Sequence, residues 1–81
     1  MKVALSDAVL DSIADVPPAV RKAFFKQVKF LEKDLHHPSL RAKKYDQGKD
    51  RWQARVGKGW RFYFKIIDDT YHVSAVIPHP K

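Results

Sequence analysis

The second half of this 81-residue chain alternates apolar and polar residues, which is the pattern of strands that bury one face. The run WRFYFKII places Trp60, Phe62 and Phe64 on one side and Arg61 and Tyr63 on the other. RWQARV before it and TYHVSAVI after it alternate in the same way. The turn-forming segments GKG and DD separate the three runs. Together they predict an antiparallel meander, which a further strand around residues 41–45 would complete.

The GKG loop decides which residues lie opposite each other in the first hairpin. A three-residue loop aligns the two residues that flank it, and therefore also Arg55 with Arg61. Like charges directly opposite each other destabilise a sheet unless an anion neutralises both, and the planar arginine fork matches phosphate. We interpret the pair as a phosphate clamp on the polar face. The alternative is that each arginine reaches a separate carboxylate, such as that of Asp46 or Asp50.

The first half of the chain has helical spacing instead. Ser6 can cap a short helix that ends near Asp15, and the prolines at positions 17 and 18 fit the first turn of a longer helix to about Leu35. Phe25 flanks the apolar stripe of that helix and is either a core residue or, if exposed, a docking surface. The stripe itself consists of Val20, Phe24, Val28, Leu31 and Leu35.

These segments predict one α+β domain over residues 1–81. In it, an N-terminal helical hairpin packs on one face of a small antiparallel β-sheet. The helices should cover the apolar face of the strands and leave the polar face, with its two arginines, open.

The charge of the chain is high and unevenly distributed. The formal net charge is +7; residues 1–18 hold one lysine against three aspartates, a net of −2, so residues 19–81 carry +9. Eight cations fall within residues 41–61, against two aspartates. A basic cluster of this kind indicates a polyanionic partner, most simply nucleic acid. The alternative is a solvated basic surface without a specific partner.

Neither a metal nor a cofactor is expected. The chain has no cysteine, and the adjacent His36 and His37 would point about 100° apart on a helix, so they cannot chelate one ion together. The lack of cysteine fits a reducing compartment. No apolar run approaches the length of a membrane span, and acidic residues interrupt the N-terminal apolar stretch. We therefore expect a cytoplasmic protein with no membrane partner.

The C-terminal segment VIPHPK adds a histidine to the polar face. If the DD turn sets the register, Val76 lies beside Arg61 and the last residues emerge near the arginine pair. The His79 imidazole can then act as general acid or base when a ribose 2′-hydroxyl attacks the adjacent phosphorus. The alternative is a C-terminal tail whose imidazole has no role.

The order of two helices and a meander, with the stretch HPSLRAKKYDQGKDRWQARVGKGWRFYF, resembles the RelE/ParE superfamily of toxin–antitoxin toxins. The resemblance covers about Val16 to Lys81 and is most specific at Arg55, the glycine-containing turn and the pair Trp60-Arg61. It implies a RelE-like fold and a small basic toxin that a cognate antitoxin neutralises. Many members cleave mRNA in the ribosomal A site, and others poison gyrase.

The resemblance also implies roles for particular residues. Arg61 matches the arginine that holds the scissile phosphate, His79 is the proton-transfer group and Lys81 stabilises charge, so these three form the catalytic set. Gln53 departs from the family, because it stands where mRNA-cleaving members carry a basic residue. The residues expected to contact phosphate or RNA are Arg55, Gln53, Arg51, Lys43, Lys44 and Lys58.

Three functions remain open on the sequence. The first is a metal-independent, ribosome-dependent mRNA endoribonuclease whose partners are a cognate antitoxin, the ribosome and mRNA. The second is a non-enzymatic toxin that inhibits gyrase. The third is a degenerate toxin or a nucleic-acid-binding module.

Overall fold

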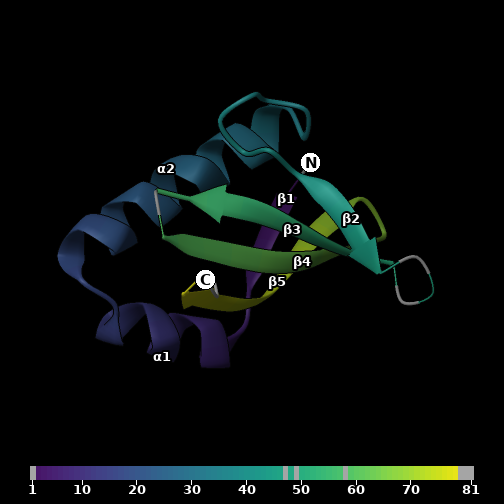
Figure 1. Ribbon diagram of the computed structural model, residues 1–81. Helices are drawn as coiled ribbons and strands as arrows, with labels where there is room; N and C mark the ends of the chain where they lie inside the picture. The colour runs from purple at the N-terminus through teal and green to yellow at the C-terminus, as the bar shows by residue number, and fades with distance from the viewer. Residues whose placement is uncertain (1, 47, 49, 58, 79–81) are drawn as a thin grey trace.

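The structure, a computed structural model, describes residues 2–46, 48, 50–57 and 59–78 of the chain. Figure 1 shows two helices and a twisted sheet of five strands. The order of elements is β1 (Lys2–Leu5), α1 (Asp7–Asp15), α2 (Pro18–Lys33), β2 (Lys43–Asp46), β3 (Arg51–Val56), β4 (Trp60–Ile67) and β5 (Thr70–Pro78).

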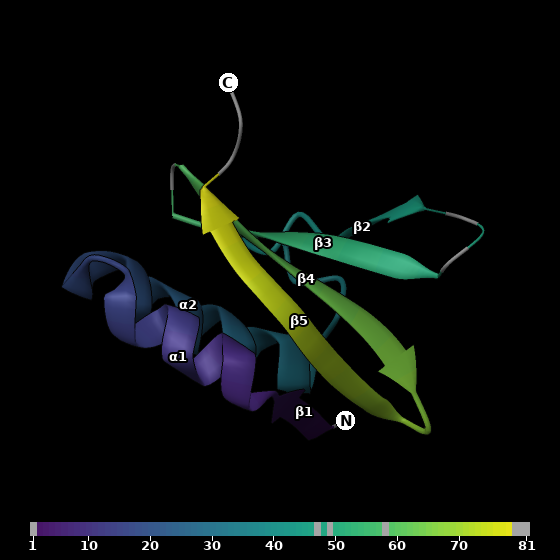
Figure 2. The same ribbon diagram turned by 90° about the horizontal axis from the view of Figure 1, so that it is seen from below.

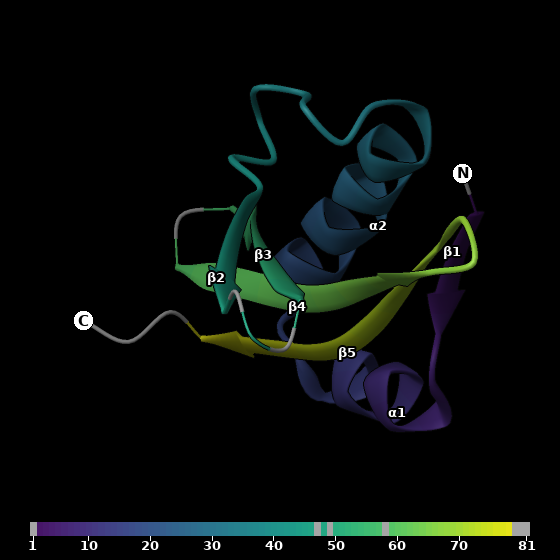
Figure 3. The same cartoon turned by 90° about the vertical axis from the view of Figure 1, so that its right-hand side faces the viewer.

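The sheet has the strand order β1-β5-β4-β3-β2. Strands β2 to β5 form the antiparallel meander that the alternating runs predict. The expectation of a purely antiparallel sheet is wrong at one edge, where β1 pairs in parallel with β5. Figure 3 shows β1 and β2 at opposite ends of the sheet. Strand β1 has no local sequence signal, because four residues are too few to show an alternation and their partner strand lies more than sixty positions away.

Local signals place both helices. The N–H of Val9 donates to the Ser6 hydroxyl oxygen (3.2 Å), which caps α1 as predicted, and the helix ends at Asp15. Helix α2 begins at Pro18 and ends at Lys33, two residues before the expected end. The reason is Asp34, whose carboxylate accepts from the N–H of His36 (2.9 Å) and so favours a turn over another helical residue.

Both helices lie on the same face of the sheet, as Figure 2 shows. The rings of Phe24 on α2 and Phe62 on β4 meet edge to face with centroids 5.5 Å apart, and both side chains are fully buried. Val9 and Ile13 of α1 belong to the same hydrophobic core. The predicted cover of the apolar face is therefore confirmed, and the polar residues of β3 and β4 lie on the opposite, open face.

A bulge in β5 shifts the register of the last hairpin. Tyr63 pairs with Ala75 and Phe64 with Val73, so Ser74 is an extra residue. As a result Ile77 lies opposite Arg61, and the prediction that Val76 lies there is wrong by one residue. Val76 turns inward and is buried, whereas uninterrupted alternation would have placed it on the polar face. The Asp68-Asp69 turn is present as expected, with both residues at positive φ (49° and 60°).

Candidate functional site

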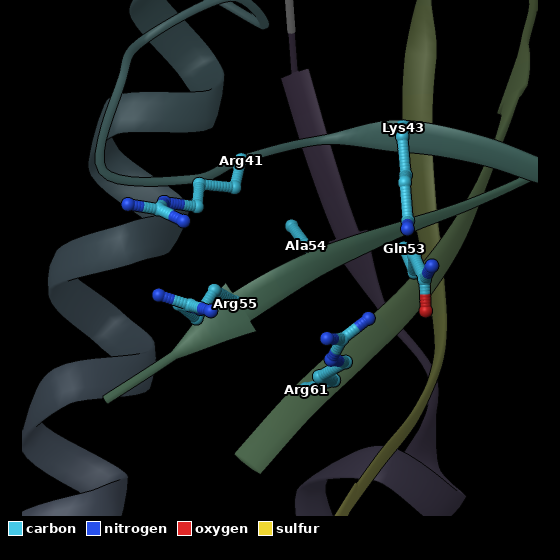
Figure 4. A pocket seen from close by; sticks show the side chains of 6 residues that line it. All are labelled: Arg41, Lys43, Gln53, Ala54, Arg55 and Arg61. Carbon is cyan, nitrogen blue, oxygen red and sulfur yellow. The ribbon is translucent and has the colours of Figure 1, made fainter. Parts of the chain in front are cut away.

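A basic pocket of about 260 Å³ lies on the open face, where the end of β3 and the start of β4 adjoin the start of β2. Arg55 and Arg61 are directly opposite each other in the hairpin, so the predicted pairing is confirmed. Among the described residues, the lining contains four cations and no carboxylate. The residues that line the pocket, shown in Figure 4, are Arg41, Lys43, Gln53, Ala54, Arg55 and Arg61.

The lining side chains come from three strands and from the loop before β2, and in Figure 4 the guanidiniums of Arg41 and Arg55 extend toward α2. In Figure 4 the Arg61 guanidinium lies between Arg55 on one side and Gln53 on the other, and the Lys43 ammonium points toward Gln53. Lys43 and Gln53 are also paired across β2 and β3. Arginine is always charged and presents its donors in a planar fork, so the pocket offers an anion several charge-assisted hydrogen bonds. Its volume is just below the usual range of about 300–1,000 Å³ for ligand pockets and suits a phosphate with part of a nucleotide.

Arg41 belongs to the pocket although the sequence analysis did not select it. The residue before it, Leu40, is fully buried, and its carbonyl accepts from the N–H of Arg55 (2.8 Å). The chain then passes through a left-handed conformation at Arg41 (φ 45°), which takes this side chain to the open face. The sequence gives only a weak signal for this, a basic residue directly after an apolar one in the loop that follows α2.

Gln27 of α2 fixes the backbone of the pocket from behind. It is the buried polar side chain of the described core, with 7% of its surface exposed. Its Nε2 donates to the carbonyl of Arg55 (2.8 Å) and to the carbonyl of Ser39 (2.9 Å), while the Ser39 hydroxyl donates to Gln27 Oε1 (3.2 Å). One amide therefore joins the end of β3 to the loop that carries Arg41. A polar residue within the apolar stripe of α2 was the available sequence signal.

Other residues expected at the site are placed elsewhere. Lys44 is paired with Trp52, on the face opposite to its neighbour Lys43, and its ammonium forms an ion pair with Asp50 (2.7 Å). Arg51 shares the open face with Arg55 but lies four residues away along β3, about 13 Å. Lys58, His79 and Lys81 lie outside the described residues, so their roles stay predictions.

The histidines after α2 have contacts of their own. The His37 ring stacks on Phe30 with centroids 3.9 Å apart, and its Nδ1 lies 2.9 Å from the Ser39 hydroxyl. Within the described part of the chain, no three His, Cys, Asp or Glu side chains are grouped to hold a metal ion. Neither helix in that part is long and apolar enough to cross a lipid bilayer.

Comparisons with known proteins decide the fold. No protein-family model and no curated protein sequence matches the chain. A chain of the archaeal RelE–RelB complex from Pyrococcus horikoshii superposes with a TM-score of 0.82 at 18% identity, over 99% of this chain and 96% of that one. The chain has the RelE fold. This confirms the fold that the resemblance implied.

Two further structures with the RelE fold extend the comparison. The isolated Escherichia coli RelE toxin matches with a TM-score of 0.76 at 14% identity, over 99% of this chain and 85% of that one. A YoeB/ParE toxin from Agrobacterium tumefaciens matches with a TM-score of 0.79 at 10% identity, over 99% of this chain and 100% of that one. The backbone is thus shared across the length of these chains, while few side chains are. The chemistry of the pocket therefore depends on the residues of this chain.

Proposed function

We propose that this protein is the toxin of a toxin–antitoxin module and acts as a ribosome-dependent mRNA endoribonuclease. The observation that carries the proposal is the basic pocket, in which Arg55 and Arg61 lie opposite each other on the open face of a RelE fold. Structures with this fold include a protein described as a toxin and another in complex with RelB. We infer that a cognate antitoxin binds this chain as well.

In the proposed reaction, the pocket holds the phosphate between two nucleotides of single-stranded mRNA. The ribose 2′-oxygen attacks the phosphorus, a bond from phosphorus to the 5′-oxygen of the next nucleotide breaks, and a 2′,3′-cyclic phosphate remains. His79 takes the proton of the 2′-hydroxyl as general base, and a water molecule gives a proton to the departing 5′-oxygen. Arg55 and Arg61 stabilise the negative charge that grows on the phosphoryl oxygens, with Lys81 as an additional cation.

Primer extension on a translated mRNA after induced expression tests this proposal. The wild-type chain should produce new 5′ ends within the coding region, and Arg61→Ala should reduce them by roughly a hundredfold or more, because it removes a donor to the reacting phosphate. Lys44→Ala is the matched control, since this lysine lies on the other face beside Asp50. Equal cleavage by the wild-type and Arg61→Ala chains would contradict the proposed role of the pocket.

A second variant distinguishes a chain that cleaves RNA from one that only binds it. His79→Ala should lose cleavage by roughly a hundredfold while it still co-sediments with ribosomes, because the arginines and not the imidazole hold the phosphate. If His79→Ala cleaves like the wild type, then His79 has no role in proton transfer.

One observation favours a second function, inhibition of a protein such as gyrase without cleavage. Gln53 contributes a neutral amide to the pocket. The mRNA-cleaving members of the RelE/ParE superfamily, which this chain resembles, carry a basic residue at this position. A toxin of this second kind would arrest growth without new mRNA 5′ ends and would inhibit DNA supercoiling by purified gyrase.

A further inference from the structure

Two tyrosine rings lie together on the open face beside the basic pocket. Tyr45 of β2 and Tyr63 of β4 have ring centroids 5.1 Å apart at an interplanar angle of 66°. Tyr63 is paired with the pocket residue Gln53, which in turn is paired with Lys43. The tyrosine pair is therefore adjacent to the wall of the pocket.

Tyr45 is unusually accessible for a large ring, with 45% of its surface exposed. It lies at an irregularity of β2, where the register shifts between Lys44 and Asp46. Such bulges redirect side chains. The tilted contact with Tyr63 fixes the ring from one side and leaves ring surface open to a ligand.

A second basic group lies beyond the tyrosines along the same strands. Arg51 is paired with Lys65, which is also paired with His72, and all three belong to the open face. Tyr63 lies between Arg61 and Lys65, two residues from each, or about 7 Å in each direction. The face therefore carries cations, then aromatic rings, then cations again along β4.

This alternation has the chemistry of single-stranded nucleic acid, in which charged phosphates alternate with flat bases. Proteins bind such strands with basic grooves that follow the backbone and aromatic side chains on which bases stack. A base paired within a duplex would not offer its face to Tyr45, because its neighbours in the stack cover it. The arrangement therefore selects an unpaired strand.

We propose that Tyr45 and Tyr63 form a stacking site for one base of single-stranded RNA, and that Arg51 and Lys65 contact the phosphate beyond that base. This proposal rests on the proposed role of the basic pocket, which would hold the phosphate on the near side. The amide of Gln53, which lies between the pocket and the rings, can hydrogen-bond to the edge of the base.

The test is equilibrium binding of a short, fluorescently labelled, 2′-O-methyl RNA, which cannot be cleaved by 2′-hydroxyl attack. Tyr45→Ala should weaken binding by about 5- to 150-fold, the range for losing one stacked base, and Tyr45→Phe should bind like the wild type. Phe25→Ala is the matched control, because Phe25 is similarly exposed (41%) but lies on α2. It should leave the affinity unchanged.

Two further measurements distinguish stacking from charge. Lys65→Ala should lower the slope of log affinity against log salt by about 0.7, the value for one phosphate contact on a single strand, whereas Tyr45→Ala should leave the slope unchanged. An RNA that lacks the stacked base should bind the wild-type chain as weakly as intact RNA binds Tyr45→Ala.

The outcomes separate this site from the function on which it rests. RNA binding by the wild type with equal affinity for Tyr45→Ala overturns the stacking site alone. No RNA binding by the wild-type chain overturns the role of the pocket and the stacking site with it. If Tyr45→Ala weakens binding of the antitoxin but not of RNA, then the rings contact protein and the proposal is wrong.

Discussion

The two faces of the sheet are built from alternate residues of the same strands, yet they have opposite properties. On the buried face, Phe62 has no exposed surface and packs edge to face against Phe24. The next residue toward the N-terminus, Arg61, is on the open face and lines a pocket with three other cations. A change of one position along β4 thus separates core from candidate site. We infer that stability and function can be removed independently in this chain.

Gln27 is the exception that connects the two faces. Its side chain is buried with the core of α2, but its hydrogen bonds hold the carbonyls of Arg55 and Ser39 at the back of the pocket. A substitution of Gln27 should therefore change both the stability of the fold and the function of the pocket. This makes Gln27 the most informative position for testing whether the two faces are independent.

The largest effect on stability is expected at Phe62. Phe62→Ala removes a fully buried ring and should lower the free energy of unfolding by about 3–5 kcal/mol, which is a large part of the total for a domain of this size. Arg61→Ala, one residue away, should change it by less than about 0.5 kcal/mol. Urea unfolding followed by circular dichroism measures both. Similar losses for the two variants would show that the faces are not independent.

Gln27→Leu should have the next largest effect. The leucine can fill much of the buried space but leaves the carbonyls of Arg55 and Ser39 without their donor, at a cost of about 1–3 kcal/mol. It should also weaken RNA binding, because the backbone that carries Arg55 and Arg41 is no longer fixed. Ser39→Ala removes the hydroxyl that contacts Gln27 Oε1 (3.2 Å) and His37 Nδ1 (2.9 Å) but leaves both carbonyls with their donor, so this control should have a smaller effect on both. Lower stability with unchanged RNA affinity would show that Gln27 is only a core residue.

The smallest effect concerns pH and again separates the faces. Burial, and secondly the carboxylate of Asp34, raise the pKa of Tyr71 on the buried face above its usual value near 10. Below pH 10 the phenol is protonated in both the folded and the unfolded state, and its contribution to the free energy of unfolding is fully present. Above it the unfolded phenol ionises before the folded one, so the free energy of unfolding falls as pH rises, by at most about 1.4 kcal/mol per pH unit. Tyr71→Phe should remove this part of the decline in urea unfolding between pH 8 and 11. An identical decline in the variant would assign it to other groups.

The sequence predicted those parts of the fold that depend on neighbours in the chain. The GKG loop was enough to pair Arg55 with Arg61, and Ser6 was enough to start α1, because turn geometry and capping act over a few residues. The bulge at Ser74 was not predictable from alternation, since Val76 is apolar and fits either face by its spacing alone.

The parts of the site that the sequence missed depend on contacts between distant segments. Gln27 lies 28 positions before Arg55, and only the packing of α2 on the sheet brings the amide to that carbonyl. Arg41 reaches the pocket because buried Leu40 fixes the loop beside β3. The parallel pairing of β1 with β5 joins the two ends of the chain and has no local signature. Such contacts follow from tertiary packing and not from periodicity.

The most direct test of the account measures RNA affinity and unfolding free energy on one variant, Arg55→Gln/Arg61→Gln. The account predicts that affinity for a short single-stranded RNA falls by at least about tenfold, because a charge-assisted phosphate contact contributes about 1.5–3 kcal/mol. It also predicts an unfolding free energy that is unchanged or slightly higher, because two like charges on paired positions are removed. Wild-type affinity in the double variant, or a loss of affinity that only follows a loss of folded protein, would contradict the claim that the open face is the functional face.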